Sequence, residues 1–94
     1  MRSIKNYQEI LLPILKRYDI KRASIFGSVA KGSDLPGSDI DLLIEPKIGF
    51  TLFAMLQLEA EISDLLNKKV DLVEFDAIKS SIRNEVMETA ITIL

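Results

Sequence analysis

The feature that most constrains this chain is a dense turn segment set between two strand-like stretches. Residues 26–46, FGSVAKGSDLPGSDIDLLIEP, hold three of the four glycines and two of the three prolines. The preceding RASIF has the β-rich character of a strand that ends at Gly27. After the turn, SDIDLLIE sets Asp39, Asp41 and Leu43 against Ile40, Leu42 and Ile44 with period two, as in a strand. The link is too short for a crossover connection, so these strands should not be parallel neighbours.

The rest of the chain predicts helices around a third strand. Apolar residues spaced by three and four predict a helix over residues 3–18, with a kink or a new turn at Pro13. A second helix is expected over residues 50–67, capped by Thr51. KVDLVEF, residues 69–75, is typical of a strand, and Asp76 could cap a last helix. The inward positions of that last helix are Ile78, Ile82, Val86, Ala90 and Ile93.

These elements predict an α/β or α+β fold with a mixed three-stranded sheet packed against helices. The helix over residues 50–67 is long enough for a crossover between the second and third strands. We expect the helices to cover the face of Ile40, Leu42 and Ile44 and to leave the aspartate face more open. With 94 residues, the chain is expected to form one domain over residues 1–94.

Composition restricts the chemistry to oxygen ligands. The chain has no cysteine and no histidine, which excludes disulfides, thiolate zinc sites and imidazole bases. Its first residues carry charges throughout, which is typical of neither a signal peptide nor a membrane span, so a cytoplasmic protein is expected.

Charge is distributed unevenly along the chain. Residues 1–31 hold seven Lys and Arg against two Asp and Glu, whereas residues 32–94 hold five against twelve. The acidic body argues against direct nucleic-acid binding and suits a metal-bound anion or a partner protein. Solvated faces of ordinary helices explain the same asymmetry equally well.

Two common motifs can be excluded in the turn segment. GSVAKG has the glycine spacing of a P-loop, but Ser33 and Asp34 follow where Lys and Ser or Thr are needed. Residues 34–45 have the length of an EF-hand loop, but Asp39 occupies the position that requires glycine.

The acidic residues of the strands suggest a metal site. Asp39 and Asp41 lie at i and i+2, so both carboxylates leave the same face with Cβ atoms roughly 6–7 Å apart. Asp71 of the third strand can face the same way. Three carboxylates suit two Mg²⁺ ions in a phosphoryl-transfer site, where the ions lie ~3.5–4 Å apart. An acidic strand edge that opposes aggregation is the structural alternative.

The glycines fit a phosphate-binding turn beside those carboxylates. Gly27 would let backbone approach a ligand, and Ser28 offers a hydroxyl and a cap for a short helix whose first N–H groups could receive a phosphate. Gly32 and LPGS, residues 35–38, would then reverse the chain, so that the first residues of the next strand lie beside this phosphate-binding turn. A plain strand-to-helix turn is the alternative for Gly27 and Ser28, and solvated charge is the alternative for Lys31.

GSVAKGSDLPGSDIDLLI resembles the glycine-serine and double-aspartate signature of the nucleotidyltransferase superfamily related to DNA polymerase beta. The chain's size, with the flanking YDIKRASIFGS and VDLVEFDAIKSSIRNEV, is similar to the minimal nucleotidyltransferase branch, the antitoxin partners of HEPN-domain toxins. The resemblance covers nearly the whole chain. Lys31 stands where many relatives have arginine.

The resemblance implies a role for each motif residue. Gly27, Ser28 and Lys31 would hold the phosphates of a nucleoside triphosphate such as ATP. Asp39 and Asp41 would bind two Mg²⁺ ions, and Asp71 would bind the ion near the attacking hydroxyl and accept its proton.

The implied reaction is transfer of AMP to a tyrosine of a HEPN toxin, which silences this ribonuclease. No part of the chain could enclose the base or the acceptor, so a partner or a second copy must complete the site. Two alternatives stay open. One is an antitoxin that neutralises its partner by binding without catalysis, and the other is an enzyme that nucleotidylates small molecules.

Overall fold

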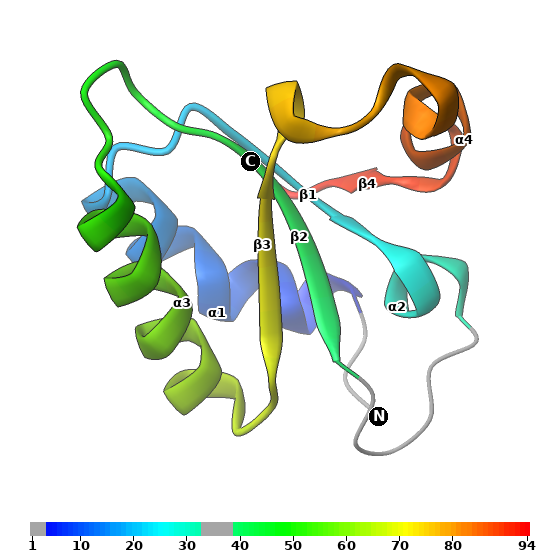
Figure 1. The fold of residues 1–94 in the computed structure, drawn as a ribbon. Coiled ribbons are helices and arrows are strands. Elements are labelled where there is room, and N and C mark those ends of the chain that lie inside the picture. Colours follow the sequence, from blue (N-terminus) through cyan, green and yellow to red (C-terminus); the bar gives the residue numbers. More distant parts are fainter. Residues whose placement is uncertain (1–3, 33–38) are drawn as a thin grey trace.

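The computed structural model describes residues 4–32 and 39–94, which form a mixed sheet with helices on both sides (Figure 1). In chain order the elements are α1 (Ile4–Arg17), β1 (Arg22–Phe26), α2 (Gly27–Lys31), β2 (Ile40–Glu45), α3 (Leu52–Leu66), β3 (Val70–Glu74), the 3-10 turn η1 (Phe75–Ala77), α4 (Ser80–Thr89) and β4 (Ile91–Thr92). The strand order is β3-β2-β1-β4. The predicted fold class is therefore confirmed.

The sheet has four strands, so the prediction of three is wrong. β1 pairs antiparallel with both β2 and β4, and β2 pairs parallel with β3. The parallel pair is joined by α3, which confirms the predicted crossover. The fourth strand is short and depends on pairing with β1: the Ile93 N–H donates to the Ala23 carbonyl at 2.9 Å. A two-residue strand at the end of an amphipathic helix has no local pattern of its own.

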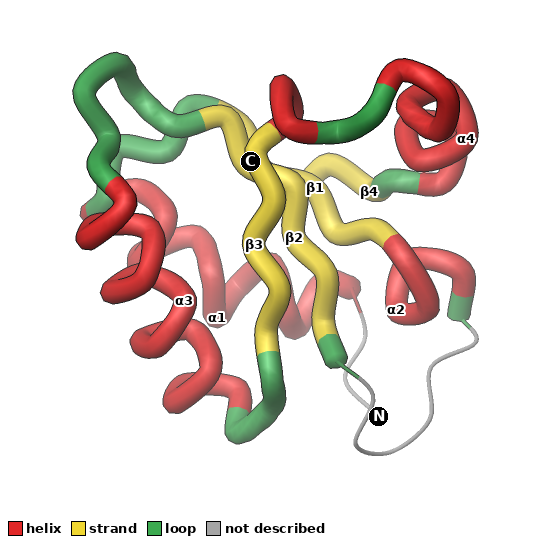
Figure 2. Tube along the Cα trace, in the orientation of Figure 1, coloured by secondary structure: helices red, strands yellow, loops and turns green. Residues whose placement is uncertain are grey.

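Two helices build the hydrophobic core against one face of the sheet. Figure 2 shows α1 and α3 on the side of the sheet away from α2 and α4. The core includes Tyr7 and Leu11 of α1, Ile62 of α3, and Ile40 and Leu42 of β2, all at most 1% exposed. The aspartates of β2 alternate with these residues and therefore face the other way. The predicted covering of the Ile40, Leu42 and Ile44 face is confirmed.

The opposite face of the sheet is partly covered by η1. The Arg22 guanidinium lies 4.7 Å from the centre of the Phe75 ring and donates to Glu45 at 3.1 Å, which links β1, the end of β2 and η1. η1 contacts β2 there, and Leu43 on this face is fully buried. The aspartate end of the same face stays more open, because Asp41 and Asp71 are only partly buried.

The predicted helices differ from the structure mainly at the C-terminal end. α1 runs continuously through Pro13, and Thr51 caps α3 by accepting the Ala54 N–H at 3.1 Å, as predicted. Asp76 does not cap the last helix, because it lies in η1 and Lys79 precedes α4. Ala90 is already extended and Ile93 follows β4, so neither belongs to α4. Ile82 is 46% exposed rather than inward. No helix in the described part of the chain is long and apolar enough to cross a membrane.

The two sides of α3 should respond differently to truncation. We expect Leu58→Ala to lower the free energy of unfolding by about 2–5 kcal/mol, because Leu58 is fully buried and its loss leaves a cavity. Leu65→Ala is the matched control on the same helix, since Leu65 is 52% exposed, and should cost less than about 1 kcal/mol. Urea denaturation of both variants measures the difference, and equal losses would contradict this placement of α3.

Candidate active site

Asp41 and Asp71 are brought together by the register of the parallel pair. β2 and β3 align so that Asp41 is the partner of Asp71 and Ile40 is the partner of Val70. Directly paired residues project from the same face of a sheet, so both carboxylates lie on the face away from α1 and α3. Asp39 precedes Asp41 by two residues and lies immediately before β2. The prediction that Asp71 faces the same way as Asp41 is therefore confirmed.

The Asp41 carboxyl is held in surroundings that disfavour its negative charge. Burial is the main reason that its pKa lies above the usual aspartate value, and the charges of Asp71 and Asp39 raise it further. In its protonated form the Asp41 carboxyl also donates a hydrogen bond to Asp71. A cation between these groups would remove the repulsion, so the site carries an electrostatic cost that a bound metal ion can offset.

Gly27 provides the space for the Asp41 carboxylate. The residue has φ +74° and directly follows Phe26, the β1 partner of Asp41. A side chain at Gly27 would collide with Oδ2 of Asp41 and lie 3.2 Å from its Cγ. Glycine is therefore required here both by the left-handed backbone and by the approach of an acidic side chain. A close approach at Gly27 is predicted from the sequence, but there a ligand rather than Asp41 was the expected neighbour.

The other predicted phosphate-binding residues lie on α2, which begins at Gly27. Ser28 is partly buried in its first turn and Lys31 is exposed in its last turn. The predicted helix is present, but Ser28 does not cap it, because Phe26 is the N-cap residue and provides no side-chain cap. No ion pair joins Lys31 to an aspartate within the described residues. Gly32 ends the helix with φ +72°, and the LPGS turn expected at residues 35–38 lies outside the described residues.

Sequence reasoning did not identify Lys69 as a neighbour of the acidic residues. Its Nζ lies 3.9 Å from Oδ2 of Asp39, and both side chains are substantially exposed. The available signal was spacing, because Lys69 precedes Asp71 by two residues and therefore shares its face. A single exposed ion pair of this length contributes little stability.

The donor chemistry of the acidic residues fits Mg²⁺, although a complete ligand shell is not assembled. Carboxylate oxygens are the ligands that Mg²⁺ selects, and Mg²⁺ usually retains several waters. Within residues 4–32 and 39–94, no three acidic side chains converge closely enough to hold a metal ion as they stand. Asp41 and Asp71 form the close pair, and Asp39 lies towards Lys69. The group best suited to a first cation is therefore the Asp41–Asp71 pair.

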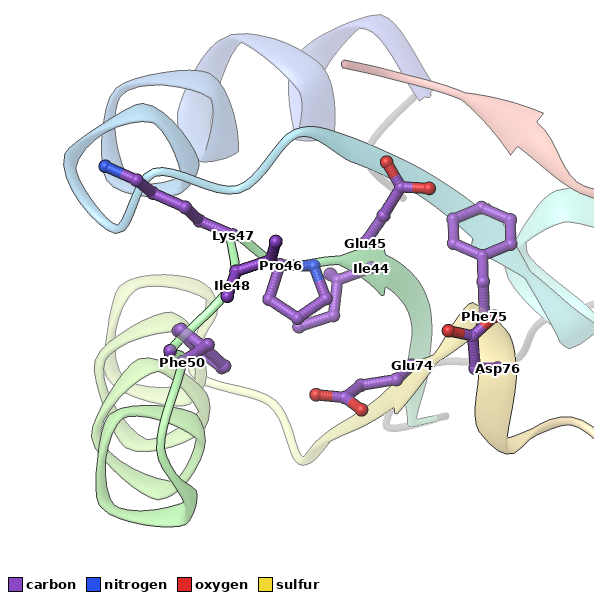
Figure 3. Close-up of a pocket in the computed structure, with 10 residues that line it drawn as sticks. Ile44, Glu45, Pro46, Lys47, Ile48, Phe50, Glu74, Phe75 and Asp76 are labelled. Atoms are coloured by element: carbon purple, nitrogen blue, oxygen red, sulfur yellow. The ribbon is translucent and has the colours of Figure 1, made fainter.

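A separate concavity lies at the other end of the same strands (Figure 3). It has a volume of about 260 Å³, and its lining includes Glu45, Pro46, Phe50, Glu74 and Phe75. Glu45 and Glu74 are the last residues of β2 and β3, whereas Asp41 and Asp71 are near the first. This concavity is thus distinct from the aspartate site, and the chemistry of the acidic residues identifies the candidate active site better than the shape of the surface does.

Alanine at Gly27 should cost more than alanine at Gly32. Both glycines have positive φ, so each substitution should cost about 1–2 kcal/mol of backbone strain. Only Gly27→Ala adds a collision with Asp41, since a Cβ added at Gly32 would have no neighbour within 4 Å. We expect a further loss of about 1–3 kcal/mol. Urea denaturation in a double-mutant cycle with Asp41→Ala measures this further loss. If Gly27→Ala costs the same extra free energy of unfolding in the Asp41→Ala background, the collision with Asp41 is not its cause.

Asp41→Asn should stabilise the metal-free protein at neutral pH. The pKa of Asp41 is raised in the folded state, so folding favours the protonated form and the ionised carboxylate reduces stability. The stability of the wild type should therefore fall as the pH rises from the usual aspartate pKa through the raised pKa of Asp41. Thermal melts with a chelator over that range measure the effect. The Asn variant should melt at the higher temperature at neutral pH, and identical pH profiles would contradict the prediction.

Comparisons with known proteins agree with this geometry. Residues 9–94 match the family described as polymerase beta nucleotidyltransferase. The chain is 33% identical over 92 residues to "Putative protein adenylyltransferase MJ0435" of Methanocaldococcus jannaschii, covering 98% of this chain and 99% of that protein. It is 29% identical over 76 residues to "Protein adenylyltransferase MntA" of Thermococcus cleftensis, covering 81% and 77% of the two chains.

Solved structures share the fold. A "putative minimal nucleotidyltransferase" superposes with a TM-score of 0.81 at 32% identity, covering 94% of this chain and 90% of that one. The chain also superposes on a chain from the solved complex of a tri-AMPylated Shewanella oneidensis HEPN toxin with an MNT antitoxin. The TM-score is 0.74 at 16% identity, and the match covers 96% of this chain and 71% of that one. The family match over most of the chain and the 32% identical structure carry the assignment: the chain belongs to the polymerase beta nucleotidyltransferase family, in its minimal nucleotidyltransferase branch.

Proposed function

We propose that this nucleotidyltransferase is a Mg²⁺-dependent protein adenylyltransferase that transfers AMP from ATP to a tyrosine hydroxyl of a HEPN-domain toxin, and so acts as its antitoxin. The observation that carries the proposal is the Asp41–Asp71 pair beside Gly27, with Asp39 immediately before β2. Relatives similar in sequence are named as protein adenylyltransferases, and a protein of the same fold is bound to an AMPylated HEPN toxin.

The aspartates would bind the metal ions and handle the proton. Asp39, Asp41 and Asp71 would hold two Mg²⁺ ions, which supply Lewis-acid polarisation of the phosphates and of the acceptor hydroxyl. The acceptor oxygen forms a bond to the α-phosphorus of ATP while the bond from that phosphorus to the pyrophosphate oxygen breaks. Asp71 takes the hydroxyl proton, and pyrophosphate leaves.

The start of α2 would hold the nucleotide. The Ser28 hydroxyl is in the first turn of α2 and directly follows Gly27, which lies against Asp41. A phosphate bound by Ser28 and by the backbone at Gly27 would thus lie next to the carboxylates. Lys31 lies three residues after Ser28, slightly less than one helical turn, and is exposed. Its ammonium group would act as a point charge towards the outer phosphates.

The aspartates should be required for transfer but not for folding. With α-labelled ATP, Mg²⁺ and the purified HEPN-domain partner, we expect the double variant Asp39→Asn, Asp41→Asn to lose label transfer to the toxin. Asp71→Asn should lower the rate by about 10²–10⁴-fold, because it removes the proton acceptor. Asp76→Asn is the control, since this exposed carboxylate lies in η1 beyond the far end of β3.

Either of two results would overturn part of this proposal. Undiminished transfer by the double variant would contradict the metal-site assignment. Loss of transfer with full neutralisation of the toxin would favour the alternative, a non-catalytic antitoxin that acts by binding its partner. Circular dichroism of each variant establishes that the fold is retained.

A further inference from the structure

A basic side chain lies beside the acidic residues of the candidate active site. The Nζ of Lys69 is 3.9 Å from Oδ2 of Asp39, and the lysine side chain is 72% exposed. In the described part of the chain, no other basic side chain forms an ion pair with Asp39, Asp41 or Asp71. Among these residues, Lys69 is therefore the cation that a bound metal ion would meet first.

The backbone of the parallel pair holds Lys69 in this place. The Ile40 N–H donates to the Lys69 carbonyl at 3.0 Å, and Ile40 is the partner of Val70 in the register of β2 and β3. Asp39 and Lys69 are the residues immediately before these two strands. Both strands begin at the lower edge of the sheet in Figure 1. The start of the ladder thus brings Asp39 and Lys69 together.

The ion pair and the aspartate pair occupy successive rows on one face of the sheet. Lys69 precedes Asp71 by two residues, as Asp39 precedes Asp41. Side chains two residues apart share a face, with Cβ atoms roughly 6–7 Å apart. A cation held by Asp41 and Asp71 would therefore be close to Asp39 and would repel the Lys69 ammonium group. The lysine and the metal ion compete for one carboxylate.

We propose that Lys69 is a positioning residue that pairs with Asp39 in the metal-free protein and releases it when a divalent cation binds. This inference rests on the metal site of the proposed function and adds an order of events. The Asp41–Asp71 pair receives the first ion, and Asp39 becomes a ligand once its ion pair opens. The ion pair explains why no three acidic side chains of the described residues converge as they stand. An exposed pair of this length is weak enough to exchange.

Substitution of Lys69 should strengthen the binding of a divalent cation. Electron paramagnetic resonance of the purified chain, with Mn²⁺ alone as the probe, measures the affinity without nucleotide or acceptor. We expect Lys69→Gln to tighten Mn²⁺ binding by about 3–10-fold, because the ion neither breaks an ion pair nor meets an ammonium group. Lys69→Arg keeps the positive charge and should bind Mn²⁺ within about twofold of the wild type.

Lys68→Gln is the matched control for net charge. It removes the same charge one residue earlier, from a side chain that takes part in no ion pair of the described residues. The affinity for Mn²⁺ should change by less than about twofold. A shift as large as that of Lys69→Gln would show that overall charge is the cause, and would overturn the proposal.

A double-mutant cycle tests whether Lys69 acts through Asp39. In the Asp39→Asn background, Lys69→Gln should change the affinity for Mn²⁺ by less than about twofold, because no carboxylate is left to release. An equal gain in both backgrounds would assign the effect to direct repulsion of the ion and would contradict the exchange. Circular dichroism of each variant checks that the fold is retained.

Failure of this inference differs from failure of the metal site. Asp41→Asn should abolish tight Mn²⁺ binding if the site is correct. Binding that depends on Asp41 but is unchanged or weakened by Lys69→Gln would overturn the role of Lys69 and leave the metal site standing. A wild type that binds no Mn²⁺ would overturn the metal site, and the exchange at Asp39 with it.

Discussion

The close approach of the Asp41 carboxyl to Asp71 is the constraint on which the candidate site depends. The register of β2 and β3 makes Asp41 the direct partner of Asp71, so the ladder holds their backbone positions side by side. The register in turn is set by the buried side chains of the other face, because a slip of one residue would expose Ile40 and Leu42 and bury the aspartates. The hydrophobic core therefore holds two like charges together. That arrangement costs stability in the absence of a cation, as is common where a site is built for binding rather than for folding.

Gly27 connects this electrostatic constraint to the backbone. The carboxyl of Asp41 occupies the space that a Cβ at Gly27 would need, so the residue that follows β1 must be glycine. The same residue starts α2, so Ser28 directly follows the glycine that lies against Asp41. Nucleotide phosphates and metal ions need to meet within one site for nucleotidyl transfer. In the proposed function, Gly27 would bring the phosphate-binding and metal-binding residues together.

The sequence predicted the parts of the molecule that repeat a clear local pattern. Alternation in residues 38–45 predicted that Asp39 and Asp41 share a face, and the same rule applied to KVDLVEF predicted Asp71. It did not predict β4, because Ile91 and Thr92 become a strand only through pairing with β1, a contact distant in sequence. The spacing of Val86, Ala90 and Ile93 also fits a helix, and local pattern alone does not separate the two structures. The ion pair of Lys69 with Asp39 depends likewise on how strands align.

The two surfaces of this small domain are separated by the sheet, and this separation has a functional consequence. A chain of this size has one core, and that core uses the inner sides of α1 and α3. The aspartate face lies on the opposite side of the sheet and stays more open, because Asp41 and Asp71 are only partly buried. In the proposed function, a protein acceptor bound over this face would exclude water from the reaction.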